Sequence, residues 1–219
     1  MSKLEKQPFS KADGELRYVF LSAFLENNIV LVQAIGICPI LAVGITLQNG
    51  VVLSVCTAAV LLPSSLFMSL LGERLPAWLR PPIYTVGAAL ILLGAAIIID
   101  SFISHELYAA LYVFLPLTAV NTLISFRAGG FSVNHNPVVA LTDALASTMG
   151  FSLVICIVSA IREAVALGTL WGKPVKLDIR IPEMALPFAA FLLLGFISAL
   201  LQWSKSVIVR RTRRKELYK

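Results

Sequence analysis

Residues 36–39, which read Gly-Ile-Cys-Pro, and residues 115–122, which read Leu-Pro-Leu-Thr-Ala-Val-Asn-Thr, decide the fold of this chain. Each stretch lies inside a long apolar segment and places a proline near polar or small residues. A proline inside a helix at membrane depth frees a backbone carbonyl, which is tolerated only where protein or a cavity satisfies it. One such break in each half of the chain predicts a functional site at the bilayer midplane.

Composition and length indicate a membrane protein. Of the 219 residues, 58% are hydrophobic and 14% are charged, whereas about a quarter of a soluble domain is charged. No segment long enough to fold as a soluble domain remains, so residues 1–219 are expected to form one polytopic membrane domain. The polar segment 1–17 has no signal-peptide pattern. The net charge of +6 is concentrated in the C-terminal tail, which indicates membrane orientation and no nucleic-acid partner.

Six apolar stretches of 18 to 23 residues are predicted to span the membrane, since about 20 helical residues cross the hydrocarbon core. They are Ile29–Leu47, Val51–Leu71, Ile83–Ile103, Leu107–Ile124, Val139–Ile161 and Met184–Trp203. The expected fold is therefore an all-α integral membrane protein with six transmembrane helices. Because the first and fourth helices each contain a break, the pattern also predicts an inverted 3+3 repeat.

The distribution of Lys and Arg predicts the orientation of the chain. With six spans, fourteen of these residues lie on one side of the membrane and four on the other. The positive-inside rule then predicts a cytoplasmic N-terminal segment, 1–17, and a basic cytoplasmic tail, 204–219, which contacts anionic lipid. Between the spans, the sequence Gln48-Asn49-Gly50 predicts a tight helical hairpin. Residues 162–182 predict an irregular external loop.

The three cysteines all lie in apolar stretches, which argues against a disulfide framework. Cys38 is the tenth residue of the nineteen-residue first span, near the midplane, and Gly36 and Pro39 weaken the helix beside it. A free cysteine is often a small buried apolar residue, but a thiolate at this depth is also a ligand for an iron–sulfur cluster, which usually needs four. Cys56 and Cys156 are displaced from the centres of their spans and are interpreted as packing residues.

Five further polar positions carry hypotheses. Asn121 and Thr122 either form hydrogen bonds with neighbouring helices or line the site opposite Cys38. Asp143 lies four residues inside the fifth span, where a carboxylate costs at least about 2.5 kcal/mol to insert. It is expected either on a proton or cation path or in a buried hydrogen bond to Ser or Asn. Arg162-Glu163, at the outer end of that span, is expected to pair with other charges at headgroup level.

Taken in order along the chain, these residues resemble the small membrane subunits of the Rnf and Na⁺-translocating NADH:quinone reductase complexes, in particular the RnfE/NqrD branch. The resemblance runs from about Asn27 to Glu163, and the ordered set of matching pieces is specific. The pieces are residues 28–39 (Asn-Ile-Val-Leu-Val-Gln-Ala-Ile-Gly-Ile-Cys-Pro), Arg80-Pro81-Pro82-Ile83-Tyr84, Phe114-Leu115-Pro116-Leu117 with Asn121, Arg127-Ala128, Asn136-Pro137-Val138 and Ala160-Ile161-Arg162-Glu163.

The resemblance implies a role in electron transfer. In the family, two sister subunits each offer two midplane cysteines and together hold a [2Fe–2S] cluster. Electrons cross the membrane through it, and movement of Na⁺ or H⁺ is coupled to that flow. Cys38 matches the first cysteine position and would be the cofactor-binding metal ligand of this chain. Thr122 stands at the second position, and a neutral hydroxyl is a poor ligand for iron.

The resemblance also implies partners and a location. The partners are a sister membrane subunit of the RnfA/NqrE type and other Rnf-type subunits that carry flavin and iron–sulfur centres, in a bacterial inner membrane. The chain would not be catalytic alone but would act as a subunit of a translocase. Asp143, Glu163, Asn121 and Thr122 are the candidates for lining an ion path or the site. Two other functions fit the same breaks, namely a small inverted-repeat secondary transporter and a scaffold subunit without a cluster.

Overall fold

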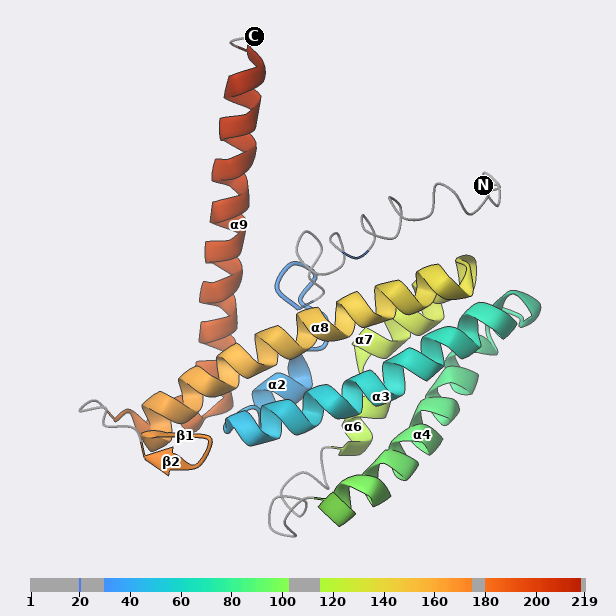
Figure 1. Cartoon of the computed structure of the whole chain (residues 1–219), viewed down its shortest axis with the longest axis horizontal. Helices are drawn as coiled ribbons and strands as arrows, with labels where there is room; N and C mark the ends of the chain where they lie inside the picture. The colour runs from blue at the N-terminus through green and yellow to red at the C-terminus, as the bar shows by residue number, and fades with distance from the viewer. Residues whose placement is uncertain (1–19, 21–29, 103–114, 175–179, 218–219) are drawn as a thin grey trace.

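The computed structural model describes residue 20 and residues 30–102, 115–174 and 180–217 (Figure 1). The segment 1–17 and residues 107–114 of the fourth expected span lie outside this part of the chain. In chain order, the elements are α2 (Ile37–Val43), α3 (Leu47–Leu71), η3 (Gly72–Arg74), α4 (Arg80–Phe102), α6 (Leu115–Ala119), α7 (Thr122–Ile124), η4 (Ser125–Phe131), η5 (Ser132–Asn134), α8 (Pro137–Arg162), η6 (Glu163–Leu167), β1 (Thr169–Leu170), β2 (Lys173–Pro174), η7 (Pro182–Ala185) and α9 (Pro187–Leu217).

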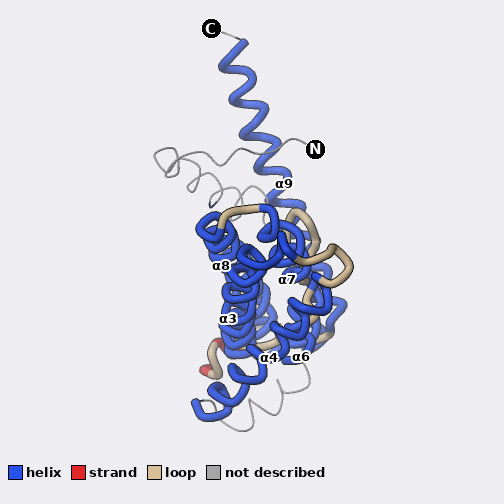
Figure 2. The backbone as a smooth tube through the Cα atoms, turned by 90° about the vertical axis from the view of Figure 1, so that its right-hand side faces the viewer, coloured by secondary structure: helices blue, strands red, loops and turns tan. Residues whose placement is uncertain are grey.

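Helices α3 and α8 pack along each other and form the core, with α4 against another side of α3 (Figures 1 and 2). About half of the apolar stretch of α3 and of α8 is buried within the protein, at 50% and 56%, against 11% in α4 and 17% in α9. Helices α4 and α9 therefore present most of their apolar surface outward. Such a surface is what a bilayer would cover.

Four helices in the described part of the chain are long and apolar enough to cross a membrane. They are Leu47–Leu71, Arg80–Ile97, Pro137–Leu167 and Pro187–Ser206, and they correspond to the second, third, fifth and sixth expected spans. The helical membrane fold predicted from the sequence is thereby confirmed. The inverted 3+3 repeat of six transmembrane helices stays a prediction, because the first and fourth expected spans form only short helical pieces where they are described.

The breaks do not lie at the two prolines themselves. Pro39 is the third residue of α2, in the first turn, where a helix leaves its N–H groups without internal partners and so tolerates proline. The helical conformation is interrupted just before α2, where Ala34 has φ 54° and Gly36 has φ 79°. In the second half, Pro116 lies within α6 and the chain breaks at its far end, before Asn121.

Several element boundaries differ from the sequence prediction. The predicted hairpin at Gln48-Asn49-Gly50 is wrong, since these residues belong to the first turn of α3. The Thr46 hydroxyl accepts the N–H of Asn49 at 3.3 Å and so starts that helix at Leu47. Within the predicted irregular loop, β1 and β2 form a short antiparallel pair. Helix α9 begins three residues later than expected, at Pro187, and continues through the basic tail to Leu217.

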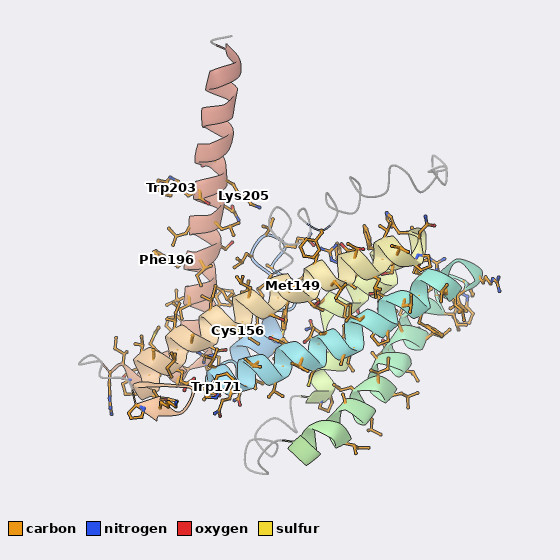
Figure 3. The ribbon with its side chains drawn as sticks, viewed as in Figure 1. Met149, Cys156, Trp171, Phe196, Trp203 and Lys205 are labelled. Carbon is orange, nitrogen blue, oxygen red and sulfur yellow. The ribbon has the colours of Figure 1, made fainter. Side chains whose placement is uncertain are left out.

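Helix α9 stands away from the group formed by α3, α4 and α8 (Figures 1 and 2). Near its start, Ala189, Ala190 and Leu194 are buried against the rest of the chain. Farther along, Phe196 and Trp203 are 66% and 69% exposed and lie on the stretch that is clear of the other helices (Figure 3). The chain alone thus leaves this apolar helix largely uncovered.

A glycine on α3 tests the close packing of the core. A Cβ added at Gly50 would lie 2.9 Å from Ser159 Oγ and 3.3 Å from Ser159 Cβ on α8. We expect Gly50→Val to lower the free energy of unfolding by about 1–3 kcal/mol, as overpacking does. The measurement is unfolding in mixed micelles titrated with sodium dodecyl sulfate. Gly94→Val is the matched control, since nothing lies within 4 Å of its added Cβ, and a loss of equal size there would refute the packing argument.

Candidate functional site

The two helix breaks meet each other. The backbone N–H of Gly36, in the first half of the chain, donates a hydrogen bond of 3.2 Å to Thr122 Oγ1 in the second half. Asn121 caps α7 by accepting the N–H of Leu123 at 3.2 Å. A Cβ at Gly36 would lie 3.4 Å from Asn121 Oδ1, and the positive φ of Gly36 also favours glycine. The structure therefore brings Asn121 and Thr122 to the break that precedes Cys38.

The three cysteines differ in exposure in a way that separates their roles. Cys38 is exposed, Cys156 is half-buried on α8 (Figure 3), and Cys56 is fully buried within α3. Cys56 thus packs in the core, whereas the Cys38 side chain is accessible to a second protein. The next two residues after Cys38, Pro39 and Ile40, are buried, so the exposed thiol sits on a helix whose other side is anchored.

The donor set at this break fits one share of an iron–sulfur cluster. Among the residues that the structure describes, no three His, Cys, Asp or Glu side chains come together as metal ligands. Thr122 is exposed, but its Oγ1 atom already accepts the Gly36 N–H, and a hydroxyl is a poor ligand for cluster iron. A cluster at Cys38 would therefore draw its other ligands from outside the described residues of this chain.

Three buried polar atoms near the breaks have no hydrogen-bond partner in the described part of the chain. They are Thr118 Oγ1, Asn121 Nδ2 and Gln33 Oε1. Ala34, beside Gln33, has a positive φ of 54°, which is uncommon for a residue with a Cβ. Unsatisfied polar groups and unusual backbone angles cluster at functional sites more often than elsewhere, so the break carries marks of a site as well as of a turn.

Asp143 forms an ion pair that the sequence did not predict. Its Oδ1 atom lies 2.8 Å from the NH1 atom of Arg127, and the two side chains are only 3% and 7% exposed. The predicted hydrogen bond to Ser or Asn is therefore replaced by a buried salt bridge. Arg127 belongs to the π-helix η4, and its guanidinium also lies about 6 Å from the rings of Phe126 and Phe131. The signal in the sequence is a lone arginine between two apolar stretches, which is typical of a loop charge.

The Arg127–Asp143 pair is only partly satisfied. Asp143 Oδ2 and the Nε and NH2 atoms of Arg127 are buried, and none of them has a hydrogen-bond partner among the residues that the structure describes. The pair could thus accept a further polar ligand, such as a water or a cation at Oδ2, without breaking its existing bond. This property keeps Asp143 a candidate for an ion path.

Arg162 and Glu163 bond to backbone groups, and neither forms the expected ion pair with other charges among the described residues. Both side chains are buried, at 0% and 1% exposure. Glu163 accepts hydrogen bonds from Leu47 N at 2.7 Å, Gly172 N at 3.0 Å and Thr169 Oγ1 at 3.2 Å. Both of its carboxylate oxygens are thus occupied by groups of the chain itself.

The ion pair gives a stability prediction. Removal of one partner from a buried pair typically costs about 3–5 kcal/mol, because the other charge is left uncompensated. We expect Asp143→Ala to lower the free energy of unfolding by this amount, and the double change Arg127→Met with Asp143→Leu to cost clearly less. Unfolding in mixed micelles measures both. A loss in the double variant equal to the sum of the losses of Arg127→Met and Asp143→Leu measured singly would show that the pair is not coupled.

Comparison with known proteins identifies the family of the chain. Residues 16–198 match the family model of the Rnf-Nqr subunit, a membrane protein. The chain is 32% identical over 208 residues to the RnfE component of the ion-translocating oxidoreductase complex of Shewanella sp. strain ANA-3, with 87% of each chain covered. It is 31% identical over 206 residues to the RnfE component of Shewanella oneidensis, again with 87% of each chain covered. The protein therefore belongs to the Rnf-Nqr family of membrane subunits.

Proposed function

We propose that this chain is the RnfE component of an Rnf-type ion-translocating oxidoreductase complex, in which it helps carry electrons across the membrane. The observation that carries the proposal is the meeting of the two helix breaks at Gly36 and Thr122, beside the exposed thiol of Cys38. Relatives whose alignment covers 87% of this chain are named as this component. We also propose both termini in the cytoplasm and the six-span inverted repeat, on the Lys and Arg distribution.

The proposed cofactor is a [2Fe–2S] cluster shared with a sister subunit of the RnfA/NqrE type. Cys38 would supply one thiolate, and such a cluster would pass electrons one at a time between carriers on the two sides. The other proposed partners are the flavin- and iron–sulfur-carrying subunits of the complex. The chain's own contribution is to hold Cys38 outward on a helix that is buried on its other side.

For the coupled movement of Na⁺ or H⁺, Asp143 is a better candidate than Glu163. Within the described ranges of the chain, one carboxylate oxygen of Asp143 has no partner, whereas both oxygens of Glu163 are bound to groups of the chain. A site that binds and releases an ion needs free acceptor capacity. We therefore assign Asp143 to the ion path and leave Glu163 outside it.

One observation favours a second candidate function, a scaffold subunit without a cluster. The Thr122 hydroxyl, which stands where the family resemblance places a cysteine, is already engaged by the Gly36 N–H. A chain that had lost the cluster could keep its break closed in this way. The same architecture would then serve only to assemble the complex.

Removal of the Cys38 thiol separates the two functions. We expect Cys38→Ser, in the purified complex, to lower iron and acid-labile sulfide by one cluster and to reduce electron transfer across the membrane by at least about tenfold, since a serine hydroxyl binds cluster iron poorly. Iron analysis and oxidoreductase assays in vesicles measure this. Cys156→Ser is the control, because Cys156 is half-buried on α8, and it should retain both. Unchanged iron and activity in Cys38→Ser would favour the scaffold.

A cysteine at position 122 tests the missing ligand. We expect Thr122→Cys to raise the iron content of the purified complex, because it places a second thiolate at the break that already holds Cys38. Thr122→Ser is the matched control, since it keeps a hydroxyl for the Gly36 N–H and adds no thiol. Iron analysis and the optical spectrum of the complex provide the measurement. An iron content that is the same in both variants would count against a shared cluster and for the scaffold.

A further inference from the structure

Two adjacent buried charges, Arg162 and Glu163, are not used by the proposed electron or ion path. They close α8 and begin η6, and each of them bonds to one side of the turn that joins α2 to α3. Both belong to a stretch long and apolar enough to span a membrane. Charged side chains in such a place are costly and therefore call for a specific role.

The guanidinium of Arg162 is surrounded by backbone carbonyls. Its NH1 atom contacts the oxygen of Gly44 at 2.8 Å and that of Ile40 at 3.5 Å. Its NH2 and Nε atoms contact three successive carbonyls of the chain before α9. These are Ala185 at 2.7 Å, Leu186 at 3.2 Å and Met184 at 3.1 Å. Because arginine has five N–H donors and no acceptor, this carbonyl cage matches its full donor capacity.

The first two carbonyls belong to the C-terminal end of α2. Helix α2 ends at Val43, with Gly44 as its C-cap. The Ile40 carbonyl already accepts the N–H of Gly44 at 3.2 Å, whereas the Gly44 carbonyl lies past the last helical turn, where no helical N–H follows to bond it. The end of a helix carries partial negative charge, which a cation stabilises. Arg162 thus supplies the hydrogen-bond donors that water would supply at an exposed helix end, and it adds a positive charge.

Glu163 does the complementary task on the other side of the turn. Its Oε2 atom accepts the N–H of Leu47, the first residue of α3, at 2.7 Å. The start of a helix carries partial positive charge, which an anion stabilises. The two adjacent side chains therefore cap two helix ends of opposite polarity, on either side of residues 44–46.

We propose that Arg162, assisted by Glu163, is the positioning residue for the short helix that carries Cys38. Helix α2 has seven residues, and an isolated helix of this length is not stable in itself. It is held before its start by the bond between Gly36 N and Thr122 Oγ1, and at its end by Arg162. The Arg162 cage ties that end to α8 and to the chain before α9, which fixes the direction in which Cys38 points.

The role of this tether in cluster geometry rests on the proposed function, but the tether itself does not. The test is hydrogen–deuterium exchange of the complete complex in lipid nanodiscs, read on the peptide that covers residues 37–46. We expect Arg162→Gln to raise the exchange rate in this peptide by about tenfold or more, because charge-assisted hydrogen bonds at the helix end are lost. Arg162→Lys keeps the charge with three donors in place of five, so exchange should return part of the way to the original rate.

The control is Arg80→Gln, which removes another arginine that donates a hydrogen bond to a backbone carbonyl, that of Leu75 at 3.2 Å. It should leave exchange in residues 37–46 unchanged. In Arg162→Gln, a peptide from the middle of α3, residues 57–68, should also keep its original rate. Unchanged exchange in residues 37–46, or an equal rise in residues 57–68, would overturn the proposal, the latter because it indicates general loosening.

Electron paramagnetic resonance of the same samples separates this proposal from the proposed function. If the cluster is present, Arg162→Gln should broaden its signal, because the Cys38 ligand is no longer held in one position. Raised exchange in residues 37–46 with an unchanged paramagnetic resonance signal would show that Arg162 holds α2 in place. It would refute the proposal that Arg162 positions Cys38. If iron is absent from the original complex, the proposed function fails, and the exchange measurement still decides whether Arg162 holds α2.

Discussion

Every backbone group that a helix break frees at membrane depth must find its hydrogen-bond partner within the protein. In the hydrocarbon core no water is present to fill that need, and an unsatisfied N–H or carbonyl costs several kcal/mol. A chain with two breaks therefore depends on side chains placed at the breaks by other parts of the fold. In this protein four side chains fulfil that requirement, and each of them bonds to a backbone group. They are Thr122, Asn121, Arg162 and Glu163.

These side chains also explain why the two halves of the chain depend on each other. The N–H of Gly36 is satisfied by Thr122, 86 residues later, and the carbonyl of Gly44 by Arg162, 118 residues later. Both partners of α2 thus come from the second half. The core pair α3 and α8 likewise joins the two halves. The first half could not close its own break alone, so the exposed position of Cys38 is a property of the complete fold.

The features of this fold differ in how far the sequence predicts them, because only some of them require particular residue types. Gly36 and the Asn121-Thr122 pair mark the breaks, because left-handed backbone and helix caps favour particular residue types. The core helices follow from long apolar stretches. The positions of the prolines are less informative, since Pro39 sits in a first turn, where it disturbs nothing. The hairpin expected at Gln48-Asn49-Gly50 is wrong because Thr46 caps α3 before them.

The partners of the buried charges leave no comparable signal. Arg127 and Asp143 are separated by 16 residues across a π-helix and a 3-10 turn, and no fixed spacing predicts such a pair. The acceptors of Arg162 are backbone carbonyls, which every residue has. Sequence alone can therefore recognise that these charges lie at unusual depth but not what they bind. For this reason the sequence makes Glu163 a candidate for an ion path, whereas its oxygens are bound to N–H and O–H groups of the chain.

Thr122 connects these constraints with function. A cysteine at this position would offer a soft thiolate to a metal but a weaker acceptor to the Gly36 N–H, since sulfur accepts hydrogen bonds less strongly than a hydroxyl oxygen. Threonine reverses the balance, because it closes the break well and binds iron poorly. Thr122, which removes one potential thiolate ligand, thus also holds the start of α2, the helix that carries Cys38. Under the proposed function, such a subunit would keep one exposed thiol in a fixed place and would leave the other ligands of the metal site to its partner, so that assembly of the complex would complete the site.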